Sequence, residues 1–338
     1  MPLPLVFIGV IAATGAIGLG KSAKAAIDTK KAKKINEEAT YAIAYGKYHL
    51  DKARKFSKNS LNQLGHCKLN ILESSVMDFV NNFSLLKNVE FKETPGIEEL
   101  NNFKIDKQEL EELKELGGFA TSIMGGIASG ALGGAITAFG AYGAAGTLAA
   151  ASTGTAIASL SGAAATNATL AFFGGGSLAA GGLGMAGGAM VLGGLVAGPA
   201  LAIMGFIVGA KAATEKNKAY ENLATAKKCA KEMEIASDMC YAIGERSNMF
   251  REVLEKLNNY LLKANVVMKE AISQHNADFN KFSNNQKKNV ALAVSVVKTI
   301  KTILDTPILT SEGTLTISSE KILNETINSD LYKGRDIL

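Results

Sequence analysis

The sequence predicts an all-α protein in which long amphipathic helices form an antiparallel bundle or coiled coil around a central membrane hairpin rich in Gly and Ala. Two observations lead to this prediction. Residues 116–210 contain no Asp, Glu, Lys, Arg or His, and they hold 25 of the 35 glycines. On both sides of this block, apolar residues recur at steps of three and four, which is the spacing of one helix face.

Composition divides the chain into five segments. Residues 1–20 are uncharged and are expected to form an apolar N-terminal helix or anchor. Residues 21–115 form a first helical arm, and the uncharged block follows at 116–210. A second helical arm covers 211–305, and 306–338 form a C-terminal tail with the pattern of a small hairpin.

Each arm carries an apolar seam with heptad-like spacing. The seam of the first arm comprises Leu61, Leu64, Leu72, Val76, Phe79, Phe83 and Leu86. The seam of the second arm comprises Leu254, Leu257, Leu261, Ala264, Met268 and Ala271. Because residues at alternating steps of three and four share one helix face, these seams predict long helices packed against each other.

The uncharged block carries glycines at intervals of four. The G-x-x-x-G units comprise Gly126, Gly130, Gly134, Gly184, Gly188, Gly194, Gly198, Gly205 and Gly209. Glycine at this spacing lets two helix backbones approach closely inside a membrane. The block is several times longer than the ~20 apolar residues that cross a bilayer. Residues 119–139 and 190–210 are the best spanning candidates, so we expect transmembrane or insertable helices that pack as a glycine zipper.

Lysines cluster directly after both apolar segments. The expected headgroup contacts are Lys21, Lys24, Lys30, Lys31, Lys211 and Lys216. Basic residues beside apolar segments suit anionic headgroups and the cytoplasmic side of a membrane. With both clusters on that side, the block crosses the bilayer an even number of times, either two or four. The sequence therefore predicts a bacterial inner-membrane location, and it leaves open a soluble form before insertion.

Two glycine motifs match nucleotide-binding patterns. Gly15, Gly20, Lys21 and Ser22 complete G-x-x-x-x-G-K-[ST], in which the lysine reaches phosphates and the serine holds Mg²⁺. Such a loop needs a parallel sheet, and the chain that follows offers no alternating strands and crossovers. Residues 182–187 match G-x-G-x-x-G but lack the acidic residue that a dinucleotide site needs about 20 positions later. A nucleotide-dependent membrane protein is therefore the third interpretation.

Other chemistry finds little support in the composition. The three cysteines are scattered, so we expect no disulfide framework, and we expect no metal site, no cofactor and no enzymatic activity. The net charge of +5, without a recognisable motif, gives no support for nucleic-acid binding. The expected partners are a lipid bilayer and either further copies of the chain or a helical partner protein.

Two long amphipathic arms around an Ala/Gly hairpin resemble the α-helical pore-forming toxins of the cytolysin A class. The hairpin alone resembles the apolar hairpin of pore-forming colicins. The resemblance is architectural, covers residues 35–275, and implies conditional insertion, oligomerisation and leakage. The leading interpretation is thus a toxin or bacterial membrane effector that inserts, oligomerises and permeabilises a membrane. The alternative is a constitutive membrane scaffold or sensor with cytoplasmic coiled-coil arms.

Overall fold

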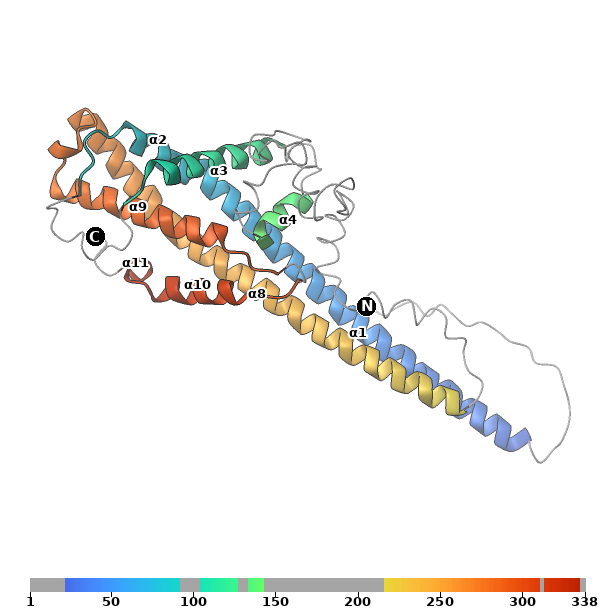
Figure 1. Ribbon diagram of the computed structural model, residues 1–338. Coiled ribbons are helices and arrows are strands. Elements are labelled where there is room, and N and C mark those ends of the chain that lie inside the picture. Colours follow the sequence, from blue (N-terminus) through green and yellow to red (C-terminus); the bar gives the residue numbers. More distant parts are fainter. Residues whose placement is uncertain (1–21, 92–103, 127–132, 143–215, 311–312, 335–338) are drawn as a thin grey trace. The chain divides into compact units, whose positions relative to one another are not determined.

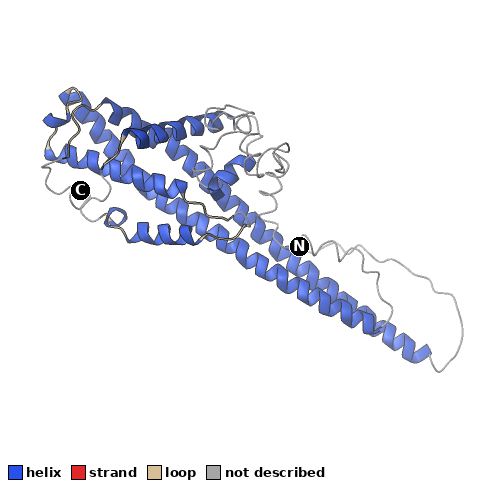
Figure 2. Cartoon of the chain, in the orientation of Figure 1, coloured by secondary structure: helices blue, strands red, loops and turns tan. Residues whose placement is uncertain are grey.

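The computed structural model shows a helical chain (Figure 1). It describes residues 22–91, 104–126, 133–142, 216–310 and 313–334. Within these ranges the backbone forms helices and loops (Figure 2). Strand-like pairing there is limited to two isolated bridges. The all-α class expected from the apolar periodicity is therefore confirmed for the described residues.

Two helices, α1 and α8, are much longer than the others, with 50 and 60 residues. In chain order the described helices are α1 (Ser22–Ile71), a π-helix (Leu72–Val76), α2 (Met77–Leu85), α3 (Lys107–Gly126), α4 (Gly133–Tyr142), α8 (Lys216–His275), a 3₁₀ turn (Phe279–Lys281), α9 (Asn284–Asp305), α10 (Ile317–Asn328) and α11 (Asp330–Lys333).

The described residues form two compact units. The first unit contains residues 22–47 of α1 and 216–232 of α8. The second unit contains the remainder of both helices together with every other described element. The boundary therefore falls inside both long helices.

The first unit is a helix pair held by small apolar side chains. Ala39, Leu223 and Ala226 are buried at its centre, and Ile35 and Ile43 pack against them. Stabilisation by burial follows the apolar area removed from water, at roughly 25 cal/mol per Å², and alanine contributes little area. The apolar contact within this unit therefore contributes only modestly to its stability.

Within the first unit, α1 and α8 run parallel. The side-chain amide of Asn222 donates to that of Asn36 at 3.4 Å. Further along both helices, Lys227 forms an ion pair with Glu38, with 3.0 Å between Nζ and Oε1. Residue numbers thus increase together on the two helices, which is the mark of a parallel pair.

The same direction holds within the second unit. The ring of Phe56 lies 5.6 Å from that of Tyr241, and Ser75 donates a hydrogen bond to the side chain of Asn258. The parallel pairing differs from the antiparallel arrangement that we expected from the sequence. Apolar periodicity is identical for both directions, and the chain between α2 and α8 is long enough to return to its starting end.

The core of the second unit is built largely from the two seams. Those seam residues that are less than 3% exposed are Leu61, Leu64, Leu72, Val76, Phe79, Leu254, Leu257, Leu261, Ala264, Met268 and Ala271. Helices α3 and α9 pack against them through Leu113, Leu116, Phe119, Val290, Val294, Val297, Ile300 and Leu304. Phe83 and Leu86 are partly buried at the margin. The seams therefore identified the core-facing sides of α1, the π-helix and α2 in the first arm and of α8 in the second.

A capping box fixes the start of α9. Ser283 Oγ accepts from the Gln286 N–H at 3.3 Å, and the Gln286 side chain accepts from the Ser283 N–H at 2.9 Å. Ser283→Ala is expected to lower the free energy of unfolding by about 1 kcal/mol, because an N-terminal N–H loses its partner. Urea unfolding measures this change. Thr225→Ala, at an exposed mid-helix position without a capping role, is the control, and equal effects of both substitutions would contradict the assigned cap.

The region after α9 differs from the expected tail because it contains two further helices. An antiparallel bridge joins Leu309 to Leu315, in the stretch that was expected to form a small hairpin. Thr316 then caps α10 by accepting from the Ser319 N–H at 3.1 Å. Arg246 of α8 donates to Ser319 Oγ at 3.0 Å, so α10 is tied to α8 at its first turn.

For the described residues, the structure contradicts the expectation of transmembrane, pore-forming helices. In the described part of the chain, no helix is both long enough and apolar enough to cross a membrane. Of the spanning candidate at 119–139, α3 contains the part up to Gly126 and α4 the part from Gly133, and 127–132 lie outside the described residues. The ten residues of α4 are about 15 Å long, half the hydrocarbon thickness of a bilayer. The candidate at 190–210 lies outside the described residues.

Candidate functional site

Positive charge is concentrated in the first unit. Its residues, 22–47 and 216–232, include eleven lysines and five Asp or Glu, which gives a net charge of +6. The whole chain carries only +5, so the rest of the protein is close to neutral. A small helix pair with this charge has a strongly positive surface potential and attracts anionic partners.

The lysines predicted to contact headgroups fall mainly in this unit. Lys24, Lys30, Lys31 and Lys216 belong to its two helices, and the side chains of Lys30 and Lys31 are exposed. Further exposed lysines of the unit are Lys33, Lys34, Lys47, Lys218, Lys227, Lys228 and Lys231. Lys21 and Lys211 lie outside the described residues.

Parallel pairing brings the starts of α1 and α8 to the same end of the first unit. The uncharged segment 1–20 joins the chain just before Ser22, and the uncharged block 116–210 ends shortly before Lys216. An antiparallel pair would have placed these two junctions at opposite ends. Both uncharged segments are therefore attached to the basic unit at one end.

Tyrosines on the first unit add an amphipathic surface to this charge. Tyr41 and Tyr45 follow each other by one turn of α1, are 69% and 56% exposed, and stack with 6.1 Å between ring centroids. Tyr220 of α8 is 53% exposed. Tyrosine places an apolar ring and a polar hydroxyl at the boundary between apolar and aqueous surroundings, as it does at membrane interfaces.

A second feature is the close contact of α4 with α1 in the second unit. A Cβ atom added to Gly65 would overlap the backbone carbonyl of Ile136, and one added to Gly140 would overlap the carbonyl of Leu61. Ile136 and Phe139 of α4 are buried in this contact. Glycine at both positions allows the two helix backbones to touch, so part of the uncharged block is held against the helical core.

The carbonyl groups at the end of α4 are bound by donors from two other elements. The side-chain nitrogen of Lys68, a fully buried residue of α1, donates to Phe139 O at 3.4 Å and to Gly140 O at 3.3 Å. The backbone N–H of Ile308 donates to Ala141 O at 2.7 Å. The last carbonyls of a helix have no partner within the helix and are satisfied by donors from elsewhere. Lys68 therefore acts as a buried C-terminal cap.

Burial changes the ionisation of this cap. Desolvation lowers the pKa of the Lys68 ammonium from 10.5 to about 7, although the charge of Asp305 partly opposes the shift. The adjacent thiol is affected in the opposite direction, since burial raises the pKa of Cys67 to about 12. Cys67 is thus neutral near pH 7 and is not a reactive thiolate.

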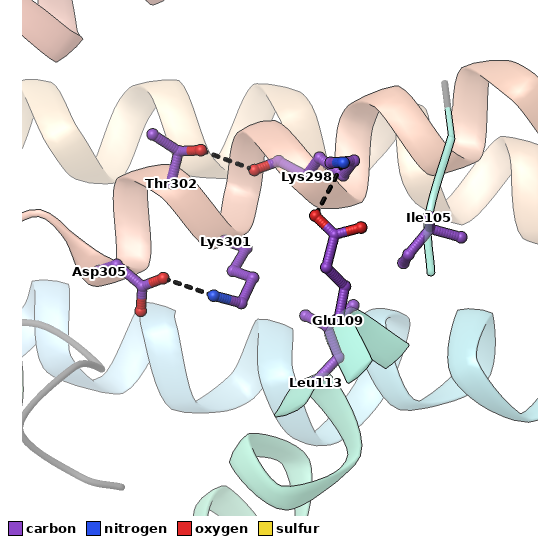
Figure 3. Close-up of a pocket in the computed structure, with 7 residues that line it drawn as sticks. All are labelled: Ile105, Glu109, Leu113, Lys298, Lys301, Thr302 and Asp305. Atoms are coloured by element: carbon purple, nitrogen blue, oxygen red, sulfur yellow. Dashed lines mark hydrogen bonds and ion pairs between the residues drawn. The ribbon is translucent and has the colours of Figure 1, made fainter. Parts of the chain in front are cut away.

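A small polar hollow lies between α3 and α9 (Figure 3). Its charged side chains neutralise one another: Lys298 pairs with Glu109 at 2.8 Å, and Lys301 pairs with Asp305 at 2.8 Å. Burial opposes the charge of Lys301, but Asp305 and Glu112 raise its pKa above the ordinary value. The hollow measures about 140 Å³, below the ~300 Å³ of a typical ligand pocket, and we regard it as a structural ion-pair cluster.

Most of the predicted packing glycines lie outside the described residues. Gly126 is the last residue of α3, and Gly134 is the second residue of α4. Gly130, Gly184, Gly188, Gly194, Gly198, Gly205 and Gly209 lie outside the described residues. The close helix contact that the structure does show uses Gly65 and Gly140, which belong to none of the predicted G-x-x-x-G units.

The phosphate-loop match falls at the edge of the described chain. Gly15, Gly20 and Lys21 precede the first described residue, and Ser22 begins α1. The parallel sheet that such a loop needs has no strand in the ranges that the structure describes. Over the same ranges, no three His, Cys, Asp or Glu side chains gather closely enough to hold a metal ion.

Sequence reasoning missed the buried lysine, although a signal was present. Lys68 and Gly65 continue the seam of α1, because Leu61, Gly65, Lys68 and Leu72 follow one another at steps of four, three and four. A lysine at a seam position is unusual, since lysine is almost never fully buried unless it is paired. The position of Lys68 in an apolar seam was therefore the signal that predicted a buried lysine with polar partners.

Comparison with known proteins returned no match among family models, curated proteins or solved structures.

Proposed function

We propose that this protein binds anionic lipid surfaces through its first unit, and that binding brings its two uncharged segments to the bilayer. The observation that carries the proposal is the parallel pairing of α1 and α8. It attaches both uncharged segments to the same end of a helix pair with a net charge of +6. A basic element and an apolar element at one end of a molecule suit the two layers of a membrane surface, the headgroups and the acyl chains.

The energetics favour an anionic over a neutral surface. Each Lys near an anionic leaflet contributes about 1 kcal/mol, and the effect falls off within a Debye length. Several of the eleven lysines therefore suffice for stable association when they face the membrane together. The exposed rings of Tyr41, Tyr45 and Tyr220 add interfacial contacts that do not depend on charge.

Lipid association is the part of the expected function that the described residues support. Permeabilisation of the bilayer by an oligomer stays a prediction from the sequence, as does the alternative of a constitutive scaffold with coiled-coil arms. Permeabilisation would release the contents of a vesicle after the protein has bound, and a scaffold would not. Loading the same vesicles with a fluorescent dye therefore distinguishes these two functions.

The test is flotation of the full chain with vesicles of phosphatidylcholine, with and without phosphatidylserine, at low and high salt. We expect binding to the anionic vesicles at low salt, and much weaker binding to neutral vesicles or at high salt. Equal binding to both kinds of vesicle, or no binding to either, would overturn the proposal.

A further inference from the structure

We infer that Lys68 is a pH-sensitive latch, which holds α4 against the second unit and loosens its hold when the lysine is protonated. The inference goes beyond lipid binding because it concerns the uncharged block itself. Helix α4 is part of this block, so the latch sets how firmly the beginning of the block is held by the helical core.

The geometry makes this lysine central to the contact. Its side chain is fully buried and reaches two carbonyl oxygens at the last turn of α4, Phe139 O and Gly140 O. Its Nζ also lies 5.8 Å from the centroid of the Phe139 ring. Around it, Asn62 donates to Thr137 Oγ1 at 3.4 Å, and the rings of Phe119 and Phe139 pack at 5.9 Å. Moving α4 away would expose the amine to water.

The charges around Lys68 do not neutralise it fully. On α9, Asp305 attracts the ammonium but forms its ion pair with Lys301 at 2.8 Å. On α1, Cys67 is a neutral thiol near pH 7, and the charges of Glu255 and Arg251 on α8 act on that thiol. Helix α4 contains no Asp, Glu, Lys, Arg or His.

The carboxylates of α3 that face α9 are also engaged in ion pairs. On α3, Glu109 and Glu112 pair with Lys298 and Lys301. An ammonium in these surroundings pays a desolvation cost that a neutral amine avoids, while the neutral amine still has two N–H groups to donate to the carbonyls.

The sign of the pH dependence follows from the lowered pKa. Between pH 7 and 10.5 the lysine is neutral when α4 is held and protonated when it is released, so release takes up a proton. Holding is therefore strongest at high pH and is progressively lost as pH falls through this window. Below pH 7 both states are protonated, and the dependence levels off. Between pH 9 and pH 6, the equilibrium for opening should rise about 100-fold.

Hydrogen exchange of the α4 backbone tests the latch without lipid, so its outcome is independent of the lipid-binding proposal. After correction for intrinsic exchange rates, residues 133–142 of the wild type should open about 100-fold more at pH 6 than at pH 9. Lys68→Met should remove this pH dependence. Lys58→Met, at an exposed position of the same helix, should leave it unchanged. A pH-independent wild type, or a Lys68→Met variant that keeps the dependence, would overturn the inference.

A direct titration keeps the inference testable if Lys68→Met does not fold. The side-chain carbon resonances of Lys68 in the folded wild type should titrate with a midpoint near pH 7. A midpoint close to the ordinary lysine value of 10.5 would show that the amine is charged throughout, and the latch would be excluded.

Discussion

Replacing Lys30, Lys31, Lys33 and Lys34 together with glutamine is expected to weaken binding to anionic vesicles about 1,000-fold, because four lysines lose about 1 kcal/mol each. These residues are exposed on the first unit, and none of them contributes to its apolar seam. The change is measured as the lipid concentration that floats half of the protein, at low salt. Circular dichroism should show unchanged helix content, since glutamine and lysine have similar helix propensities.

The matched control removes the same number of charges from the second unit. Lys58, Lys263, Lys269 and Lys288 are exposed there, and their replacement by glutamine lowers the net charge of the protein equally. We expect this variant to bind nearly as well as the wild type. If the two variants weaken binding to the same extent, total charge and not the basic helix pair would be responsible, and the assignment of the first unit would be wrong.

Replacing Gly65 with alanine should destabilise the second unit by about 3 kcal/mol, the upper part of the usual range for overpacking. The new methyl group would overlap the backbone carbonyl of Ile136, and a backbone atom cannot move aside as a flexible side chain can. Gly140→Ala meets the backbone of Leu61 in the same way and should have a similar effect. Urea unfolding gives the change in stability, and hydrogen exchange of α4 shows whether this helix is released first.

Gly118→Ala is the control for these two substitutions. Gly118 is exposed in α3, and no atom lies within 4 Å of the position that its Cβ would take. Alanine at an unhindered helix position stabilises by about 0.5–1 kcal/mol relative to glycine. Gly65→Ala and Gly140→Ala should therefore be less stable than the wild type, and Gly118→Ala should be slightly more stable. A Gly65→Ala protein as stable as Gly118→Ala would show that α4 does not touch α1 at this point.

Periodic features of the sequence predicted the fold class and the buried faces of the long helices. All six members of the seam between Leu254 and Ala271 are buried, because a helix buries the face that carries its apolar side chains. The lysine clusters that follow the two uncharged segments likewise account for the basic character of the first unit. Both inferences use only neighbours along the chain, which is why they required no knowledge of how the helices are arranged.

Features that depend on the pairing of distant segments could not be predicted from the sequence. The direction of α8 relative to α1 leaves no mark on apolar spacing, and our expectation of an antiparallel pair was wrong. The uncharged composition around 119–139 was consistent with a membrane span, but the packing of α4 on Gly65 depends on tertiary contacts. Composition alone does not distinguish an apolar helix buried in protein from one buried in lipid.

Parallel pairing of α1 and α8 also has a consequence for synthesis of the protein on the ribosome. Asn36 and its partner Asn222 are 186 positions apart, and at about 5–20 residues per second this distance takes roughly 10–40 s to translate. During that interval α1 has emerged without the helix that covers its seam. Contacts of such high sequence separation also form slowly in refolding chains. Cells that make this protein would therefore need to shield the apolar face of α1 from aggregation until α8 is complete.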